Sequence, residues 1–182
     1  MRMKAYQKKV VLALRYMGEE AYEEWNVAKH SQDDLTRARY CPRLDVAVGP
    51  FNIDRKVDHN IQRINSAYNK HKGFLDDLES KAAYCGKGFG TNANPRCFMA
   101  IEIENKDTRK HRLGSILNAS ALGKVGIVVG WDEKVTESLV KIQDYMDFLW
   151  KHQKMAGHLQ NAMIIERSVF LEDLTRLLKG GT

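Results

Sequence analysis

The chain has 182 residues, of which 43% are apolar and 29% are charged, and its formal net charge is +6. This length is enough for one domain with a substantial core, and the composition excludes a disordered chain. No apolar run approaches the length of a bilayer span, which argues against a membrane protein. We therefore expect one cytoplasmic domain over 1–182. The basic charge is a weak indication of an anionic partner.

The three cysteines, Cys41, Cys85 and Cys97, are odd in number and have neither CxxC nor CxH spacing. A disulfide framework or a zinc site would require paired spacings. We interpret all three as small buried apolar residues in a reducing compartment, which agrees with a cytoplasmic location.

The first half of the chain shows one helical pattern and one strand pattern. Apolar residues recur at spacings of four and three from Val10 to Trp25, which predicts an amphipathic helix over about 4–27 rather than a signal peptide. The β-branched stretch RLDVAVGPF (43–51) predicts a strand that closes in a turn.

A heptad-like apolar stripe then runs through residues 57–82. It predicts a long helix or helical hairpin over 56–83, which Gly73 could divide in two. We expect this segment, at about 54–84, to be a helical insertion. Its stripe would pack on the rest of the protein or on a second subunit, in which case the protein would be a homodimer.

The second half alternates strand and helix patterns, which together with the first half predicts an α/β sandwich with a mixed or parallel sheet. The Gly- and Asn-rich stretch at 85–96 precedes a strand and lacks the GK[ST] ending of a phosphate-binding loop, so we interpret it as a connection. The expected elements are a strand at 97–105, a helix at 109–123 capped by Asp107 or Thr108, a strand at 125–131, a helix at 133–155, a strand at 162–166 and a helix at 168–179.

The strand at 97–105 carries charges where a buried strand should be apolar. Side chains alternate between the two faces of a strand, so Glu102, Glu104 and Lys106 share one face. Two carboxylates separated by about 6.6 Å on a sheet face repel one another and lose solvation unless a cation lies between them. Mg²⁺ prefers carboxylate oxygens and water as ligands. Asp45 interrupts the apolar strand at 43–51 in the same way and is the best candidate for a third ligand.

This arrangement resembles the PD-(D/E)xK nuclease superfamily. The matching pieces are Asp45 on one strand, Glu102-Ile-Glu104-Asn-Lys106 on the next, the helix at 109–123 and the strand VGIVVGW. The resemblance implies a restriction-endonuclease-like α/β/α sandwich with a central mixed sheet and a helical insertion. It also implies a Mg²⁺-dependent endonuclease that hydrolyses DNA phosphodiester bonds, with Mn²⁺ as a substitute, in restriction, junction resolution or repair.

The sequence departs from the family pattern and leaves its register open. Leu44 precedes Asp45, whereas the family has proline there. Glu102 can be the family's acid with Glu104 in the place of the lysine, which we favour, or Glu104-Asn-Lys106 can be the literal Glu-x-Lys. The resemblance implies catalytic roles for Asp45, Glu102, Glu104 and Lys106.

Basic residues surround the charged strand. Residues 84–124 contain seven Lys or Arg and three acidic residues. The start of a helix combined with cations favours phosphate, so we expect this region to bind nucleic acid. Lys110 and Lys124 could also substitute for Lys106, and Glu20 or Glu24 on the first predicted helix could add to the metal site. The expected nucleic-acid contacts are Arg109, Lys110, His111, Arg112 and Lys124.

A non-enzymatic function remains the alternative. The same fold could serve as a catalytically inactive nucleic-acid-binding or assembly module. In that case Glu102 and Glu104 would lie on an edge strand, face water and pair with Lys106, Arg109 or Lys110.

Overall fold

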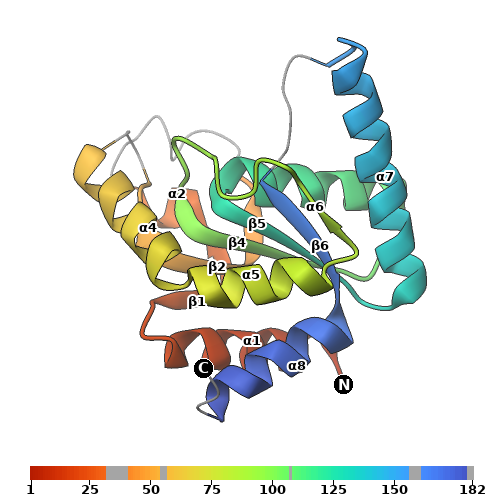
Figure 1. The fold of residues 1–182 in the computed structure, drawn as a ribbon. Helices are drawn as coiled ribbons and strands as arrows, with labels where there is room; N and C mark the ends of the chain where they lie inside the picture. The colour runs from red at the N-terminus through yellow and green to blue at the C-terminus, as the bar shows by residue number, and fades with distance from the viewer. Residues whose placement is uncertain (32–40, 54–56, 107, 156–160, 180–182) are drawn as a thin grey trace.

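The computed structural model describes residues 1–31, 41–53, 57–106, 108–155 and 161–179. In this part of the chain, strands form one six-stranded mixed sheet, in the order β1-β2-β4-β5-β6-β3, with helices on both faces (Figure 1). This confirms the predicted α/β class and the mixed sheet.

The elements follow the predicted order, with two additional strands. The strands are β1 (Ala21–Asn26), β2 (Arg43–Phe51), β3 (Tyr84–Cys85), β4 (Cys97–Glu104), β5 (Gly123–Gly130) and β6 (Ala162–Glu166). The helices are α1 (Met3–Tyr16), α2 (Val27–His30), α4 (Asp58–Lys70), α5 (Lys72–Lys81), α6 (Arg109–Leu122), α7 (Glu133–Lys151) and α8 (Arg167–Leu178). Asp107, one of the two predicted caps of α6, lies outside the described residues, and the other, Thr108, makes no side-chain cap hydrogen bond.

The strand directions bring several chain segments to one edge of the sheet. Strands β4, β5 and β6 are parallel, whereas β2 is antiparallel to both β1 and β4. One edge of the sheet therefore contains the end of β1, the start of β2 and the ends of β4, β5 and β6. We call it the C-terminal edge. At this edge Glu104 lies beside Gly130, which lies beside Glu166.

Two helical layers enclose the sheet. Helices α1, α4, α5 and α8 cover one face, and α6 and α7 cover the other (Figure 1). All eight residues of β4 are buried. Met99, Ile101 and Ile103 belong to the core beneath the first layer, while Ala100 packs with residues of the opposite face. The predicted alternation is confirmed from Met99 to Ile103, whereas Phe98 packs in the same core as its neighbour Met99.

The predicted helix over about 4–27 is wrong beyond Tyr16. Gly18 has a φ of +80°, a conformation that glycine adopts without strain, and the chain turns there into β1. Ala21 and Trp25 are both buried, but they lie on a strand. Two residues four apart share a face in a helix and in a strand alike, so this spacing could not distinguish the two structures.

The segment predicted as a helical insertion is helical and consists of two helices, α4 and α5. The break falls at His71, two residues before the expected Gly73. Ile64, Leu75 and Leu78 are completely buried in the core of this same chain. The stripe at 57–82 therefore packs on the protein's own sheet, and a homodimer would need another surface.

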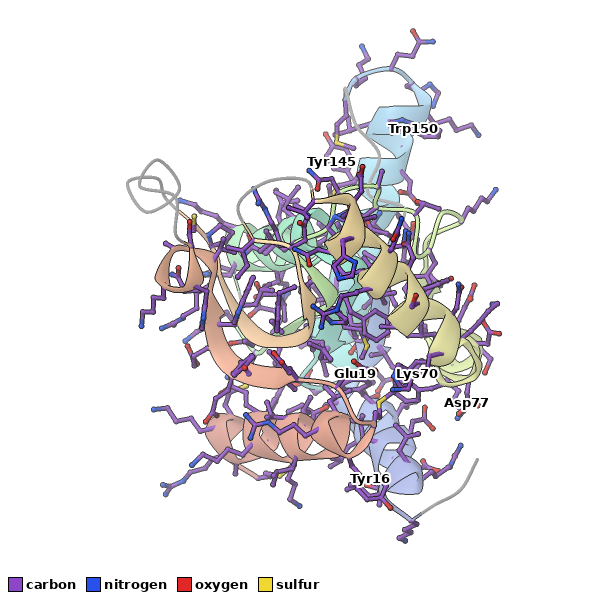
Figure 2. All side chains as sticks on the ribbon, turned by 90° about the vertical axis from the view of Figure 1, so that its left-hand side faces the viewer. Tyr16, Glu19, Lys70, Asp77, Tyr145 and Trp150 are labelled. Atoms are coloured by element: carbon purple, nitrogen blue, oxygen red, sulfur yellow. The ribbon has the colours of Figure 1, made fainter. Side chains whose placement is uncertain are left out.

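An ionic cluster fixes the junction of α4 and α5 to the turn after α1. One oxygen of Glu19 lies 2.8 Å from both Lys70 Nζ and His71 Nε2. Figure 2 shows Glu19 and Lys70 next to each other, between α1 and α4. Burial alone would raise the pKa of Glu19, but the hydrogen bonds from Lys70 and His71 outweigh it and lower this pKa. The His71 ring also stacks on the buried Phe98.

Two further predictions concern exposure. No described cysteine forms a disulfide, and of the three only Cys97 is fully buried, while Cys41 and Cys85 are half-buried. Among the described residues, no helix has the length and apolar character needed to cross a membrane.

Substitution of Leu78 by Ala should lower the free energy of unfolding by about 2–5 kcal/mol, because it leaves a cavity in the core. Val57 is the matched control, since it lies on the same predicted stripe but is 44% exposed. Val57→Ala should change the free energy by less than about 0.5 kcal/mol. Urea denaturation followed by circular dichroism measures both. Equal effects of the two substitutions would contradict the packing described for the insertion.

Candidate metal-binding site

Glu102 and Glu104 are buried beneath α6. Their side chains are 6% and 4% exposed, respectively. Glu102 accepts a hydrogen bond of 3.1 Å from Asn118 Nδ2, and Glu104 accepts one of 2.9 Å from Ser115 Oγ. Because Ser115 and Asn118 are three residues apart, both lie on the inner face of α6. This helix therefore fixes the orientation of both carboxylates.

Asp45 joins these two glutamates from the neighbouring strand. Its Oδ2 accepts a hydrogen bond of 2.7 Å from the backbone N–H of Ile103, and its Oδ1 accepts one of 2.9 Å from Gln7 Nε2. The pairing of β2 with β4 extends toward this edge as far as Val46 and Ile101. Beyond that pair, the Asp45 side chain takes the backbone hydrogen bond of Ile103. This arrangement places Asp45 at the predicted site, on the strand next to the two glutamates.

The surroundings of Asp45 and Glu102 disfavour the ionised forms of these two carboxyl groups. Burial, followed by the charges of Asp45 and Glu104, raises the pKa of Glu102 well above its usual value. Burial also raises the pKa of Asp45, and the charges of Glu24 and Glu104 add to this effect. In the described part of the chain, none of the three carboxylates forms an ion pair with Lys or Arg.

The donor set fits a hard divalent cation. Carboxylate oxygens are the ligands that Mg²⁺ prefers, and a cation would relieve the repulsion among buried carboxylates. Asp45, Glu102 and Glu104 would hold it. Over the described ranges, no group of three or more His, Cys, Asp or Glu side chains has an arrangement that could hold a metal ion as it stands. The carboxylate oxygens instead accept hydrogen bonds from neighbouring amide, hydroxyl and backbone groups.

Glu24 also belongs to this site, although its predicted position on a helix is wrong. It lies in β1, between the pairs Glu23–Val46 and Trp25–Leu44, and so faces the position of Asp45. Its φ of 52° is uncommon for a residue other than glycine and is typical of functional sites. The other candidate, Glu20, lies at the opposite end of β1, where its backbone carbonyl accepts a hydrogen bond from Gly49.

Gln7 is a site residue that the sequence analysis missed. Its amide nitrogen contacts Asp45 at 2.9 Å and Glu24 Oε1 at 3.5 Å, while Glu24 Oε2 lies 2.8 Å from Arg43 Nε. Gln7 is almost completely buried and lies three residues before the buried Val10. A polar residue on an apolar stripe was the signal that could have identified it.

Lys106 and the first turn of α6 lie at the rim of the site. The backbone N–H of Lys106 donates a hydrogen bond of 2.6 Å to Glu104 Oε1, so the chain turns around this carboxylate as it leaves β4. Within the described residues, the Lys106 ammonium has no hydrogen-bond or ion-pair partner. Arg109, Lys110 and His111 are exposed on the following turn. These four residues therefore form a basic, accessible rim.

The structure does not bring Arg112 or Lys124 to this rim. Arg112 is buried, and its Nη1 lies 2.6 Å from Ser138 Oγ, where it connects α6 to α7. Lys124 is the second residue of β5, whereas Glu104 pairs with Gly130 at the end of that strand. Six residues of strand span about 20 Å, so Lys124 lies near the opposite edge of the sheet. Burial there lowers the pKa of Lys124.

Comparisons of this chain with protein-family models, with curated proteins and with solved structures found no match. The resemblance to PD-(D/E)xK nucleases therefore remains a prediction.

Replacement of Glu102 by Gln should stabilise the protein at neutral pH by about 0.5–2 kcal/mol, because it removes a buried charge. The pKa of Glu102 is higher in the folded state than in the unfolded state. Its contribution to the free energy of unfolding is therefore present in acid and is lost as the pH rises through the folded-state pKa. The difference between variant and wild type should therefore shrink as the pH falls. Urea denaturation at several pH values measures it.

Glu23→Gln is the control for this experiment, because Glu23 is exposed on β1. It should change the stability by less than about 0.5 kcal/mol throughout the pH range. A destabilised Glu102→Gln at neutral pH would show that the ionised form of Glu102 is favourable in the fold.

Proposed function

We propose that this protein is a divalent-metal-dependent nuclease of the PD-(D/E)xK type, which hydrolyses phosphodiester bonds in DNA. The observation that carries the proposal is the gathering of the half-buried Asp45 with the buried Glu102 and Glu104 at one edge of the sheet, without a cationic partner in the described residues. Buried carboxylates that repel one another reduce stability, and a function that requires a cation explains their presence.

The order and pairing of the elements support this assignment. Strand β2 with Asp45 pairs with β4, and β4 is followed by α6 and by the parallel strand β5. This is the sequence of elements that the resemblance implies, and it supports a restriction-endonuclease-like fold.

Asp45, Glu102 and Glu104 would hold Mg²⁺, with Mn²⁺ as a substitute. A bound divalent cation supplies an activated water and neutralises charge that develops on the phosphate. We favour the register in which Glu102 is the family's acid and Glu104 takes the place of the lysine. Glu102 is buried in β4, close to Asp45 of the neighbouring strand β2. Lys106, in contrast, lies beyond the end of β4.

The basic rim would position the substrate. The ammonium of Lys106 is unpaired within the described residues, and the Lys106 backbone N–H contacts Glu104, so this exposed side chain starts from the rim of the site, where it can bind a phosphate oxygen. Arg109, Lys110 and His111 extend the positive surface along the start of α6. Hydrolysis would add the oxygen of water to phosphorus and break the bond to the leaving sugar oxygen, which takes up a proton. The contacts of the rim are to the DNA backbone, so they would give affinity rather than sequence selectivity.

The wild-type protein should convert supercoiled plasmid to nicked or linear DNA with Mg²⁺ or Mn²⁺, and EDTA should abolish this activity. Glu104→Ala should reduce the rate by at least about a hundredfold, because it removes a metal ligand. Glu23→Ala should retain the wild-type rate, because Glu23 is exposed on β1 and lies opposite Val46 rather than Asp45. Gel electrophoresis of the plasmid forms measures all three rates.

Metal binding is measured separately from cleavage. Mg²⁺ should raise the melting temperature of the wild type in proportion to the logarithm of its concentration above the Kd, and Asp45→Asn should weaken this response. DNA binding without metal-dependent cleavage would contradict the nuclease proposal and support an inactive binding module. Equal cleavage by wild type and Glu104→Ala would show that the nuclease activity comes from a contaminant.

Lys106→Ala should slow cleavage by about tenfold or more, whereas Lys124→Ala should leave it unchanged. The two substitutions remove the same charge, but only Lys106 lies at the rim of the site. Single-turnover cleavage rates at saturating DNA measure the difference. If the two variants were equally impaired, the effect would reflect loss of overall positive charge, and the assignment of Lys106 would be wrong.

A further inference from the structure

A second surface, separate from the carboxylates, exposes large apolar side chains. Tyr145 and Phe148 on α7 are 61% and 54% exposed, and Leu113 and Leu117 on α6 are also exposed. Tyr145, Leu113 and Leu117 line a groove of about 540 Å³, whose lining also includes Ile142, Met146 and Leu149. We call these residues of α6 and α7 the α6–α7 surface. Soluble monomers rarely expose a contiguous apolar patch of this kind, so it indicates an interaction site.

The position of this surface leaves it open to a partner. In Figure 1 the C-terminal half of α7 extends beyond the sheet and beyond the neighbouring helices. Figure 2 shows Tyr145 and Trp150 on this projecting half, well away from the Glu19 and Lys70 cluster. The projecting part of α7 therefore packs against little of the protein's own core.

The aromatic rings form a continuous stripe along α7. Tyr145, Phe148 and His152 follow one another at spacings of three and four, which places them on one face of the helix. The ring centroids of Tyr145 and Phe148 are 6.5 Å apart, and those of Phe148 and His152 are 4.4 Å apart. Such a stripe is suited to packing against another helix.

Two charges on one flank of the stripe are complementary to those of a second copy, and the groove lining also contains Lys141, which pairs with Glu137, and Arg109 of the basic rim. Asp144 and Lys151 are seven residues apart, which places them on the same flank of α7. Within the described residues, neither of them forms an ion pair. If two copies of α7 pack antiparallel about a two-fold axis close to Phe148, Asp144 of each copy lies opposite Lys151 of the other. An acidic or a basic partner would match only one of these charges, whereas a second copy matches both.

We propose that the α6–α7 surface is the interface of a homodimer, in which the Tyr145 and Phe148 stripes of two copies pack against each other and against the grooves. The pairing is isologous, with Phe148 near its centre and two reciprocal ion pairs at its sides. This interface replaces the stripe at 57–82 that the sequence suggested, because that stripe is buried within the chain. The inference does not depend on the proposed nuclease function.

Sedimentation equilibrium and light scattering test this proposal. From about 1 µM to about 100 µM, the wild type should change from monomer to dimer by mass action. Phe148→Asp should remain monomeric throughout this range. Tyr16→Asp on α1 is the matched control, because Tyr16 is an aromatic residue with 63% exposure on a different surface (Figure 2), and it should dimerise like the wild type.

Charge reversal tests the geometry of the dimer. Asp144→Lys and Lys151→Asp should each raise the dimer Kd by about tenfold or more, and the double variant should restore it, because the ion pairs are then exchanged. A wild type that is monomeric at all concentrations would overturn the proposal, and a different partner would then cover this surface. Dissociation by Tyr16→Asp as strong as that by Phe148→Asp would also overturn it. So would failure of the double variant to restore the dimer. Thermal denaturation verifies that each variant is folded.

Discussion

The clustering of the half-buried Asp45 with the buried carboxyl groups of Glu102 and Glu104 is the constraint around which this structure is arranged. A buried carboxylate without a cation raises the free energy of the folded state, and each neighbouring carboxylate adds to the cost. Hydrogen bonds to Asp45, Glu102 and Glu104 offset part of this cost. The remaining stability must come from the apolar cores on both faces of the sheet. The stability of the whole domain therefore maintains an arrangement that is unfavourable by itself.

The surroundings of the carboxylates show how closely the backbone is adapted to them. Ile103 gives its backbone N–H to Asp45 in place of a strand partner, and Glu24 takes a left-handed conformation beside it. Gln7 connects the two acidic side chains from α1. The first two of these features interrupt regular strand structure at the C-terminal edge. Together they indicate that the edge is shaped by a requirement other than stability.

The sequence predicted those parts of the fold that depend on local periodicity. The alternation in β4 identified Glu102 and Glu104, and the interruption of an apolar strand identified Asp45. The sequence could not distinguish a helix from a strand over 21–26, because Ala21 and Trp25 have a spacing common to both. It therefore placed Glu24 on the wrong element. Gln7 was missed because its role depends on a contact with Asp45, 38 residues away in the chain.

The sequence also could not predict which of the basic residues and which of the apolar stripes are buried. A sequence places Arg112 beside Arg109, but the helix directs Arg112 inward to Ser138 and leaves Arg109 exposed. The stripe at 57–82 and the stripe on α7 have similar patterns. One lies over the sheet and is buried, while the other extends beyond it and stays open. Which stripe becomes core depends on the position of the sheet, and the pattern alone carries no such information.

The position of the helical insertion has a consequence for folding. The hydrogen bond from Ile103 to Asp45 joins residues 58 positions apart, and α4 and α5 lie between them in the chain. Contacts of such long range form late, because a large loss of chain entropy precedes them. The helices of the insertion can form locally and bring the two strands together. The carboxylates assemble only when this loop has closed, so a partly folded or newly synthesised chain does not contain the site.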